Sequence, residues 1–405
     1  MSISKDIMKS LAEEALLPQE ELMSIGKSKK HLVIGIPCEN SFQEHRIGLT
    51  PEAVGVLVNN GHTVFVESNA GMHISFQDKD YSEAGAQIKR NAEEVYKADM
   101  VLKVSSPSEK EISWMLPGST LMSSMQMVSG LKNSVLNLMK RDITAIAWDL
   151  IKDKDGIYPG IRAMSEIAGN TSILIAAEIL SDLENGHGIM MGGISGVPPS
   201  EVVILGAGTV GEFAARAALG LGASVKLFDN SNYRLRRLQN NVGRRLYTSI
   251  LQTEELLAAL KTADVVIGAL RPVHGRSPVV VSADMISQMK FGSVIIDVSI
   301  DRGGCFETSE TTNHTNPTFE KYGVIHYGVP NIPSRVAKTA SRALSNIFLP
   351  VLLRMGDVGG CKNLIKIDPG FRNSVYIFQG NLTNEIIGDA FGLPYKNLDL
   401  LIATL

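Results

Sequence analysis

The 405-residue chain is poor in the features that mark several protein classes. Its three cysteines, Cys38, Cys305 and Cys361, form neither a disulfide framework nor a pair with metal-ligand spacing. Its 39 Lys and Arg nearly balance 42 Asp and Glu, and no segment concentrates basic residues as nucleic-acid binding would require. Its apolar runs are far shorter than the roughly 20 residues that cross a bilayer. We therefore expect no nucleic-acid partner, no membrane segment and no metal.

The N-terminal stretch is charged throughout and lacks the apolar core of a secretory signal. With so few cysteines, this predicts a reducing, cytoplasmic location. Residues 1–30 combine a short amphipathic pattern with a polar stretch, and we expect them to form an N-terminal extension.

What the sequence does contain is an alternation of strand and helix patterns. Residues 31–157 alternate short apolar runs with helix-period segments, which is typical of βα units in a mainly parallel sheet. Residues 158–336 open with a long helical stretch and a glycine-rich loop, and then repeat the pattern with five further strand candidates. Residues 337–405 are mainly helical and too poor in strands to fold alone, so we expect them to pack on the first domain. The predicted fold is α/β, with two doubly wound domains and the second inserted in a discontinuous outer, substrate-binding domain.

A glycine motif lies between the first strand candidate of residues 158–336 and an alanine-rich helix. Gly206, Gly208 and Gly211 form G-x-G-x-x-G in this strand-to-helix context. The first glycine permits a tight turn, the second lets the backbone approach a pyrophosphate, and the third lets helix and strand pack closely. Asp229 ends the next strand, where a carboxylate accepts hydrogen bonds from the adenine-ribose hydroxyls and repels a 2′-phosphate. The motif predicts a Rossmann-like domain that binds NAD rather than NADP, while Arg234, Arg236 and Arg237 are expected to form a solvated helix face.

Several segments in combination resemble alanine dehydrogenases and the related NAD-binding α chain of proton-pumping transhydrogenase. They are IGIPCENSFQEHRIGLTP, AMSEIAGN, MMGGISGVPPSEVVILGAGTVG, SVIIDVSIDRGGC and YGVPNIPSRVAKTAS. The resemblance covers about residues 31–400 and implies two α/β domains, with the nucleotide domain inserted in the outer one. It also implies an oxidoreductase of amino-acid catabolism that oxidatively deaminates L-alanine to pyruvate and ammonium with NAD.

The resemblance assigns roles to four residues. Arg46 falls on the family's arginine for the substrate carboxylate, which suits a guanidinium because it grips a carboxylate through two parallel hydrogen bonds. Asp301 falls on the acidic residue near the nicotinamide, just past a strand of the doubly wound sheet. Asn331 and Ser165 fall on two cofactor-contacting positions.

Two positions depart from the alanine dehydrogenase pattern. Ser105 stands where those enzymes have a substrate-binding lysine, and Gln126 stands where they have the catalytic histidine. Glutamine cannot shuttle a proton near neutral pH, so we expect slow alanine oxidation unless another group compensates. Lys103 shares its strand face with Ser105 and is the nearest candidate, with His274 and His326 as others.

The first function predicted from the sequence is therefore an NAD-dependent amino-acid dehydrogenase with a small carboxylate substrate. The alternatives are a soluble transhydrogenase-like NAD-binding subunit and a catalytically weak NAD-binding regulator. The transhydrogenase chain also lacks the lysine and the histidine, but it carries Gln at the position of Asp301. Because family members are oligomeric and the helix MSEIAGNTSILIAAEIL is rich in apolar residues, we also expect a homo-oligomer, either a dimer or a hexamer.

Overall fold

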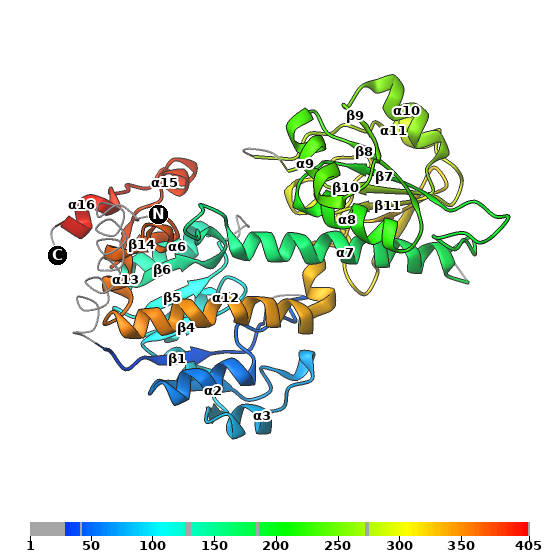
Figure 1. Ribbon diagram of the computed structural model, residues 1–405. Coiled ribbons are helices and arrows are strands. Elements are labelled where there is room, and N and C mark those ends of the chain that lie inside the picture. Colours follow the sequence, from blue (N-terminus) through cyan, green and yellow to red (C-terminus); the bar gives the residue numbers. More distant parts are fainter. Residues whose placement is uncertain (1–28, 41–42, 126–130, 184–185, 272–274, 404–405) are drawn as a thin grey trace, which may run out of the picture. The chain divides into compact units, whose positions relative to one another are not determined.

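The chain folds into two compact units, shown by a computed structural model (Figure 1). The structure describes the chain except for residues 1–28, 41–42, 126–130, 184–185, 272–274 and 404–405. Of the described residues, those up to Ile161 and from Ser341 onward form the first unit, and Arg162–Ala340 form the second. Two helices, α7 (Pro159–Ser181) and α12 (Ala337–Asp357), carry the chain from one unit to the other.

An eight-stranded sheet forms the centre of the first unit, in the order β15-β14-β6-β5-β4-β1-β2-β3. Strands β1 to β6 are parallel, while β14 and β15 are antiparallel additions at one edge. The strands are β1 (Val33–Ile36), β2 (Thr63–Glu67), β3 (Gln87–Lys89), β4 (Met100–Leu102), β5 (Thr120–Ser123), β6 (Thr144–Ala147), β14 (Val375–Phe378) and β15 (Asn381–Leu382).

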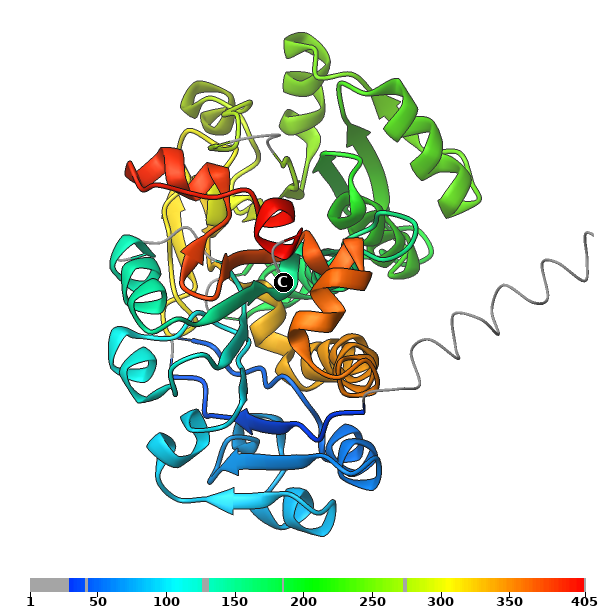
Figure 2. The ribbon, with the colours of Figure 1, turned by 90° about the vertical axis from the view of Figure 1, so that its left-hand side faces the viewer.

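Helices cover both faces of this sheet because neighbouring strand residues point to opposite sides. Val101 packs in a core cluster with Leu131 and other residues of α6. The next residue, Leu102, faces the other side, where it and Phe348 of α12 both lie against Gly48. Figure 2 shows α12, in orange, and α6, in teal, on opposite sides of the sheet. The helices of this unit are α2 (Pro51–Asn59), α3 (Asp78–Glu83), α4 (Ala92–Tyr96), α5 (Glu109–Trp114), α6 (Leu131–Lys140), α13 (Cys361–Ile367), α14 (Pro369–Arg372), α15 (Glu385–Phe391) and α16 (Leu398–Ala403).

The second unit is built on a seven-stranded sheet in the order β12-β13-β11-β10-β7-β8-β9, parallel except for β12. Along β7, Val202 and Ile204 pack toward α7 and α8, whereas Val203 and Leu205 pack toward α10 and α11. This alternation gives the sheet one apolar layer on each face. Its strands are β7 (Glu201–Leu205), β8 (Ser224–Phe228), β9 (Tyr247–Ser249), β10 (Val265–Gly268), β11 (Val294–Asp297), β12 (Thr318–Lys321) and β13 (Val324–Tyr327), and its helices are α8 (Thr209–Gly220), α9 (Asn232–Val242), α10 (Thr253–Thr262) and α11 (Ala283–Ser287).

The predicted α/β class, with two doubly wound parallel-dominated sheets, is confirmed. All ten strand candidates of the sequence form strands, and both sheets contain short strands that the apolar pattern does not mark. Three of these, β3, β9 and β12, have exposed or half-buried residues, which is expected at sheet edges. The C-terminal tail is not only helical, because β14 pairs with β6 of the first sheet.

Candidate functional site

The glycine motif forms the turn between β7 and α8, at the carboxyl edge of the second sheet. Gly206 has a φ of +114°, and a Cβ there would lie 2.5 Å from the carbonyl oxygen of Ala269. Gly211 lies in the first turn of α8, where a Cβ would lie 1.8 Å from the carbonyl oxygen of Gly206. Both positions therefore require glycine for the turn to close.

Gly208 has a different role, because nothing lies within 4 Å of a Cβ built on it. It is the residue that precedes α8, so the unpaired backbone N–H groups of that helix begin beside open space. A helix N-terminus next to a glycine without steric neighbours is suited to bind a phosphate group closely. The loop thus fits the pyrophosphate of a dinucleotide.

Asp229 lies directly beside this loop. Its side chain is buried and its carboxylate accepts the backbone N–H of Ala207 at 2.8 Å and that of Ser231 at 2.7 Å. Each carboxylate oxygen has two lone pairs, so these bonds orient Asp229 and leave acceptor capacity for ribose hydroxyls. The position supports the NAD-binding role predicted from the sequence.

The three arginines that follow on α9 differ from one another, although the sequence predicts one solvated face for all. Arg234 and Arg236 are exposed, and Arg234 lies 3.9 Å from Asp229. Arg237 instead turns inward: its Nη2 donates to the carbonyl of Ala207 at 3.2 Å, and its buried Nε has no hydrogen-bond partner in the described part of the chain. Helical spacing alone does not reveal this contact with the glycine loop.

Asp301 and Asn331 meet at the carboxyl ends of β11 and β13. Asp301 lies in a short 3-10 helix, η3 (Ile300–Arg302), and its Oδ1 accepts the backbone N–H of Asn331 at 3.3 Å. Asn331 has a φ of +57° and begins a second such helix, η4 (Ile332–Val336). The structure therefore brings together two residues that are 30 positions apart and that the family resemblance assigns to the nicotinamide side.

A buried acid that the sequence analysis does not single out fixes the turn that carries Asp301. Asp297 ends β11 and accepts the backbone N–H groups of Ser299 at 2.9 Å and Cys305 at 3.1 Å, together with the hydroxyl of Ser309. Burial raises the pKa of Asp297 above its ordinary value despite these hydrogen bonds. Burial also raises the pKa of the Cys305 thiol well above its ordinary value, as expected for an unreactive cysteine.

Ser165 lies on α7, one turn before the point where this helix crosses α8. A Cβ at Gly169 would lie 2.4 Å from the carbonyl oxygen of Val210, so the two helices approach very closely there. Residues four apart share a helix face. Ser165 is therefore on the same side of α7 as this contact with α8.

The other predicted site residues lie in the first unit, near the carboxyl ends of β1 and β4. Arg46 is 5% exposed, and its Nε and Nη2 donate to the two carboxylate oxygens of Glu44 at 2.7 and 2.6 Å. A guanidinium has its N–H donors in a fixed plane, so this bidentate pairing holds Arg46 in one orientation.

Lys103 is in a buried network rather than on an open surface. Its side chain is 1% exposed, with Nζ 2.9 Å from Glu111 and 3.7 Å from Glu39. Tyr96 donates to the same carboxylate oxygen of Glu111 at 2.6 Å. Burial alone would lower the pKa of Lys103, but Glu39 and Glu111 outweigh it and raise that pKa above its ordinary value. Lys103 therefore stays charged and paired, which does not suit it to accept a proton.

Ser105, where the sequence resemblance implies a lysine, is bonded to the same network. Its backbone N–H donates to Glu39 Oε2 at 3.2 Å, and its hydroxyl makes a short hydrogen bond to the same oxygen. The backbone N–H of Val104 donates to the other oxygen of Glu39 at 2.5 Å. The sequence analysis does not single out Glu39, whose contacts depend on the pairing of β1 with β4.

Two histidines in the described part of the chain, His326 and His45, are already engaged by neighbouring groups. His326 is buried in β13, and its two ring nitrogens lie 2.8 Å from the hydroxyl of Thr308 and 2.9 Å from the carbonyl of Val324. His45 precedes Arg46 and packs its ring against that of His73, with centroids 4.3 Å apart. His274 and Gln126 lie outside the described residues.

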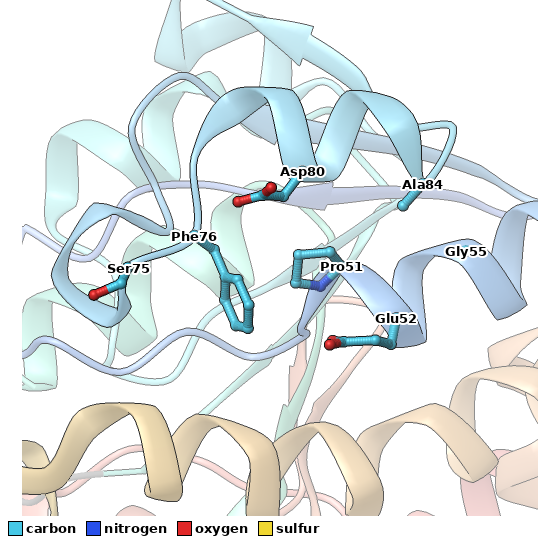
Figure 3. A pocket seen from close by; sticks show the side chains of 7 residues that line it. All are labelled: Pro51, Glu52, Gly55, Ser75, Phe76, Asp80 and Ala84. Atoms are coloured by element: carbon cyan, nitrogen blue, oxygen red, sulfur yellow. The ribbon is translucent and has the colours of Figure 1, made fainter.

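A separate open pocket with a volume of about 470 Å³ lies along α2 and α3 (Figure 3). It contains none of the predicted site residues, and its lining consists of Pro51, Glu52, Gly55, Ser75, Phe76, Asp80 and Ala84. Among the described residues there is no group of three or more His, Cys, Asp or Glu that would hold a metal ion. Within the same residues, no helix is long and apolar enough to cross a membrane.

Comparison with known proteins decides the family. Residues 35–168 match the model of the N-terminal domain of alanine dehydrogenase/PNT, and residues 172–385 match that of its C-terminal domain. The chain belongs to this family. The resemblance inferred from the sequence motifs is thereby confirmed.

Relatives within the alanine dehydrogenase/PNT family extend over nearly the whole chain. Alanine dehydrogenase 2 of Staphylococcus aureus (strain Mu50 / ATCC 700699) is 39% identical over 367 residues, which is 90% of this chain and 98% of that protein. A solved L-alanine dehydrogenase superposes with a TM-score of 0.84 at 37% identity, covering 89% of this chain and 99% of the other. The transhydrogenase from Sinorhizobium meliloti, at 24% identity and a TM-score of 0.74 over 87% of this chain and 99% of that one, shares the fold.

Proposed function

We propose that this protein is an NAD-dependent dehydrogenase that oxidatively deaminates L-alanine or a closely related amino acid. The observation that carries the proposal is the cofactor cradle of the second unit: open space at Gly208, a helix N-terminus behind it, and Asp229 bonded to the loop. Membership of the alanine dehydrogenase/PNT family and the 39% identical relatives named alanine dehydrogenase support the amino-acid substrate.

The residues have distinct roles in this reaction. The glycine loop binds the pyrophosphate through backbone N–H groups. Asp229 accepts hydrogen bonds from the ribose hydroxyls and repels a 2′-phosphate. Asp301, fixed through Asn331 and the Asp297 turn, contributes a carboxylate on the nicotinamide side. NAD, when bound, supplies the group that accepts a hydride from the substrate.

Arg46 orients the substrate through its carboxylate. Two parallel N–H···O bonds from a planar guanidinium fix a carboxylate in position and in rotation. The bidentate pairing with Glu44 prepares Arg46 for this role, because the guanidinium plane is set before the substrate arrives. Such preparation reduces the entropy that binding must otherwise overcome.

The test is steady-state NADH production with a panel of amino acids and 2-hydroxy acids, with L-alanine as the reference. We expect turnover with a small L-amino acid and none with the 2-hydroxy acids. The variant Arg46→Lys should raise KM by about tenfold or more, because Lys cannot make the bidentate contact. Turnover with 2-hydroxy acids alone, or with no substrate while hydride passes to an NADP-binding partner, would contradict the proposal.

The oligomeric state stays a prediction. Apolar side chains of the second unit are exposed on α7 and in the segment that follows it, including Leu174, Met190, Ile194 and Val197. Such exposed residues are compatible with the predicted homo-oligomer.

A further inference from the structure

The carboxyl ends of β1 and β4 form the place where a ligand is expected in the first unit. Chain order runs outward from β1 through β2 to β3, then returns to the other side of β1 with β4. In open α/β sheets, ligands bind in the crevice outside the strand ends where the order reverses. Glu39 follows β1 and Ser105 follows β4, so both residues lie at this crevice.

Among the described charged side chains at this crevice, the acids outnumber the cations. Three carboxylates, Glu39, Glu44 and Glu111, have side chains that are at most 7% exposed. They face two similarly buried cations, Arg46 and Lys103. A half-buried acid at the end of β2, Glu67, adds to the excess: it accepts the backbone N–H of Cys38 at 2.8 Å.

Ser105 brings a hydroxyl and no charge to Glu39. A lysine there would bring a third cation beside Glu39, whereas Ser105 offers only a hydroxyl. Lys103 does not make up the difference, because its shorter contact, 2.9 Å, is with Glu111 rather than with Glu39, at 3.7 Å. Among the described residues, Glu39 is therefore bonded to the backbone N–H groups of Val104 and Ser105 and to the hydroxyl of Ser105, with Lys103 farther away.

We propose that Ser105 and Glu39 form a proton relay that accepts the proton of the substrate's α-ammonium group. This inference rests on the proposed amino-acid dehydrogenase function and names the group that performs its first proton transfer. The relay lies at the position where the sequence resemblance implies a lysine in alanine dehydrogenases.

The relay balances as a single proton transfer. The hydroxyl oxygen of Ser105 takes one proton from the α-ammonium group, while the hydroxyl proton of Ser105 passes to Oε2 of Glu39. The ammonium becomes a neutral amine and Glu39 becomes a neutral carboxylic acid, so net charge is unchanged. The amine lone pair can then form the C=N bond as hydride leaves the α-carbon for oxidised NAD.

The environment of Glu39 favours this role. Burial raises the pKa of Glu39 above its ordinary value, although Lys103 and the hydrogen bond from Ser105 act in the opposite direction. A raised pKa brings a carboxylate closer to the working pH, where a general base is most effective. Glu111 behaves differently: burial would raise its pKa, but Lys103 and the hydroxyl of Tyr96 hold it below its ordinary value.

The experiment measures kcat and KM for L-alanine as functions of pH in four variants. Glu39→Gln and Ser105→Ala each break the relay, whereas Ser105→Thr keeps the hydroxyl. Ser106→Ala is the matched control, because the hydroxyl of Ser106 donates to the carbonyl of Ser124 at 2.7 Å and not to Glu39. Circular dichroism and NADH binding report whether each variant folds.

We expect Glu39→Gln and Ser105→Ala to lower kcat by about 10²–10⁴-fold and to remove the acidic limb of the pH profile. NADH affinity should be unchanged, Ser105→Thr should keep the limb, and Ser106→Ala should match the wild type. Folded Glu39→Gln and Ser105→Ala variants with the wild-type profile would overturn the relay and leave the proposed function intact.

Infrared difference titration of the wild type against Glu39→Gln provides a readout that does not need turnover. We expect a carboxyl signal that titrates above the ordinary glutamate value of 4.5 and that shifts in Ser105→Ala. If the wild type oxidises no amino acid, the proposed function fails. The infrared titration then still tests whether Ser105 and Glu39 form an acid–base pair. A Glu39 signal that is unchanged in Ser105→Ala would overturn the pairing, because the hydrogen bond from Ser105 lowers the pKa of Glu39.

Discussion

The first five strands of each sheet follow the same order, but the two sheets line their crevices differently. In each, the second and third strands run outward from the first, and the fourth returns to its other side. This order places a crevice between β1 and β4 and another between β7 and β10. The second unit lines its crevice with backbone, because Gly206, Gly208 and Gly211 have no side chains. The first unit fills its crevice with buried charged side chains.

This difference shows what each crevice can recognise. Backbone N–H groups at a helix N-terminus attract any phosphate and cannot be changed by substitution except through a clash. Charged side chains in a buried cluster are tuned by each other, so one replacement changes the protonation of several groups. The first unit is therefore the region in which relatives of one fold can differ in chemistry.

The largest expected effect concerns the buried pairing in the first unit. Lys103→Met should lower the free energy of unfolding by about 3–5 kcal/mol, because it leaves Glu39 and Glu111 without their cation. The control is Lys97→Met, which removes an exposed partner of Glu93 at 2.8 Å and should cost at most about 0.5 kcal/mol. Chemical denaturation measures both. Equal losses in the two variants would show that the cluster is not a buried network.

The pH dependence of that loss has a definite sign. The folded-state pKa of Glu111 is held below 4.5, so its stabilising contribution is complete above that value and disappears as the pH falls through the folded value. The folded-state pKa of Lys103 is raised above 10.5, so its contribution is complete below that value and disappears as the pH rises through the folded value. The difference between wild type and Lys103→Met should therefore shrink in acid. A difference that grows in acid would contradict the pairing.

The second prediction tests the backbone-lined crevice. Gly208 has a φ of −78°, which alanine adopts without strain, and a Cβ there meets no protein atom within 4 Å. Gly208→Ala should fold normally and weaken NADH binding by about 10–100-fold, or about 1.4–2.8 kcal/mol, because the methyl group occupies the space of the pyrophosphate. Gly220→Ala, at the other end of α8 and also without neighbours, is the control. Calorimetry with unchanged NADH affinity in Gly208→Ala would show that the dinucleotide does not bind at this loop.

The smallest predicted effect concerns cofactor choice. NADH should bind more tightly than NADPH, and Asp229→Ala should narrow that difference by about tenfold, because the carboxylate no longer repels the 2′-phosphate. Part of the change will appear as weaker binding of both cofactors, since Asp229 also accepts the N–H of Ala207. Competition binding with the two reduced cofactors measures the ratio. If the wild type binds NADH and NADPH with nearly equal affinity, the predicted specificity for NAD is wrong.

The sequence predicts the second crevice much better than the first, for a physical reason. Gly206, Gly208, Gly211 and Asp229 are close in sequence, and the turn that they form is local, so their spacing reveals their role. Glu39 reaches Ser105 only because β1 pairs with β4, and no local pattern encodes that contact. The inward turn of Arg237 and the fixing of the Asp301 turn by Asp297 likewise depend on the packed structure. Lys103 lies directly after β4, not on a strand with Ser105 as the sequence predicts, and its two carboxylate partners become visible only in three dimensions.

The division of the first unit into two stretches of chain affects how the protein is made. Residues of the second unit are contiguous, so that unit has all its strands once Ala340 has left the ribosome. The first sheet receives β14, the partner of β6, only after most of the chain has been synthesised. Because domains generally fold as units during synthesis and distant pairings are slow, we expect the cofactor-binding unit to reach its native state first. Until β14 is synthesised, one edge of β6 is unpaired and can pair with another chain. We expect chaperones to bind the nascent chain at this edge.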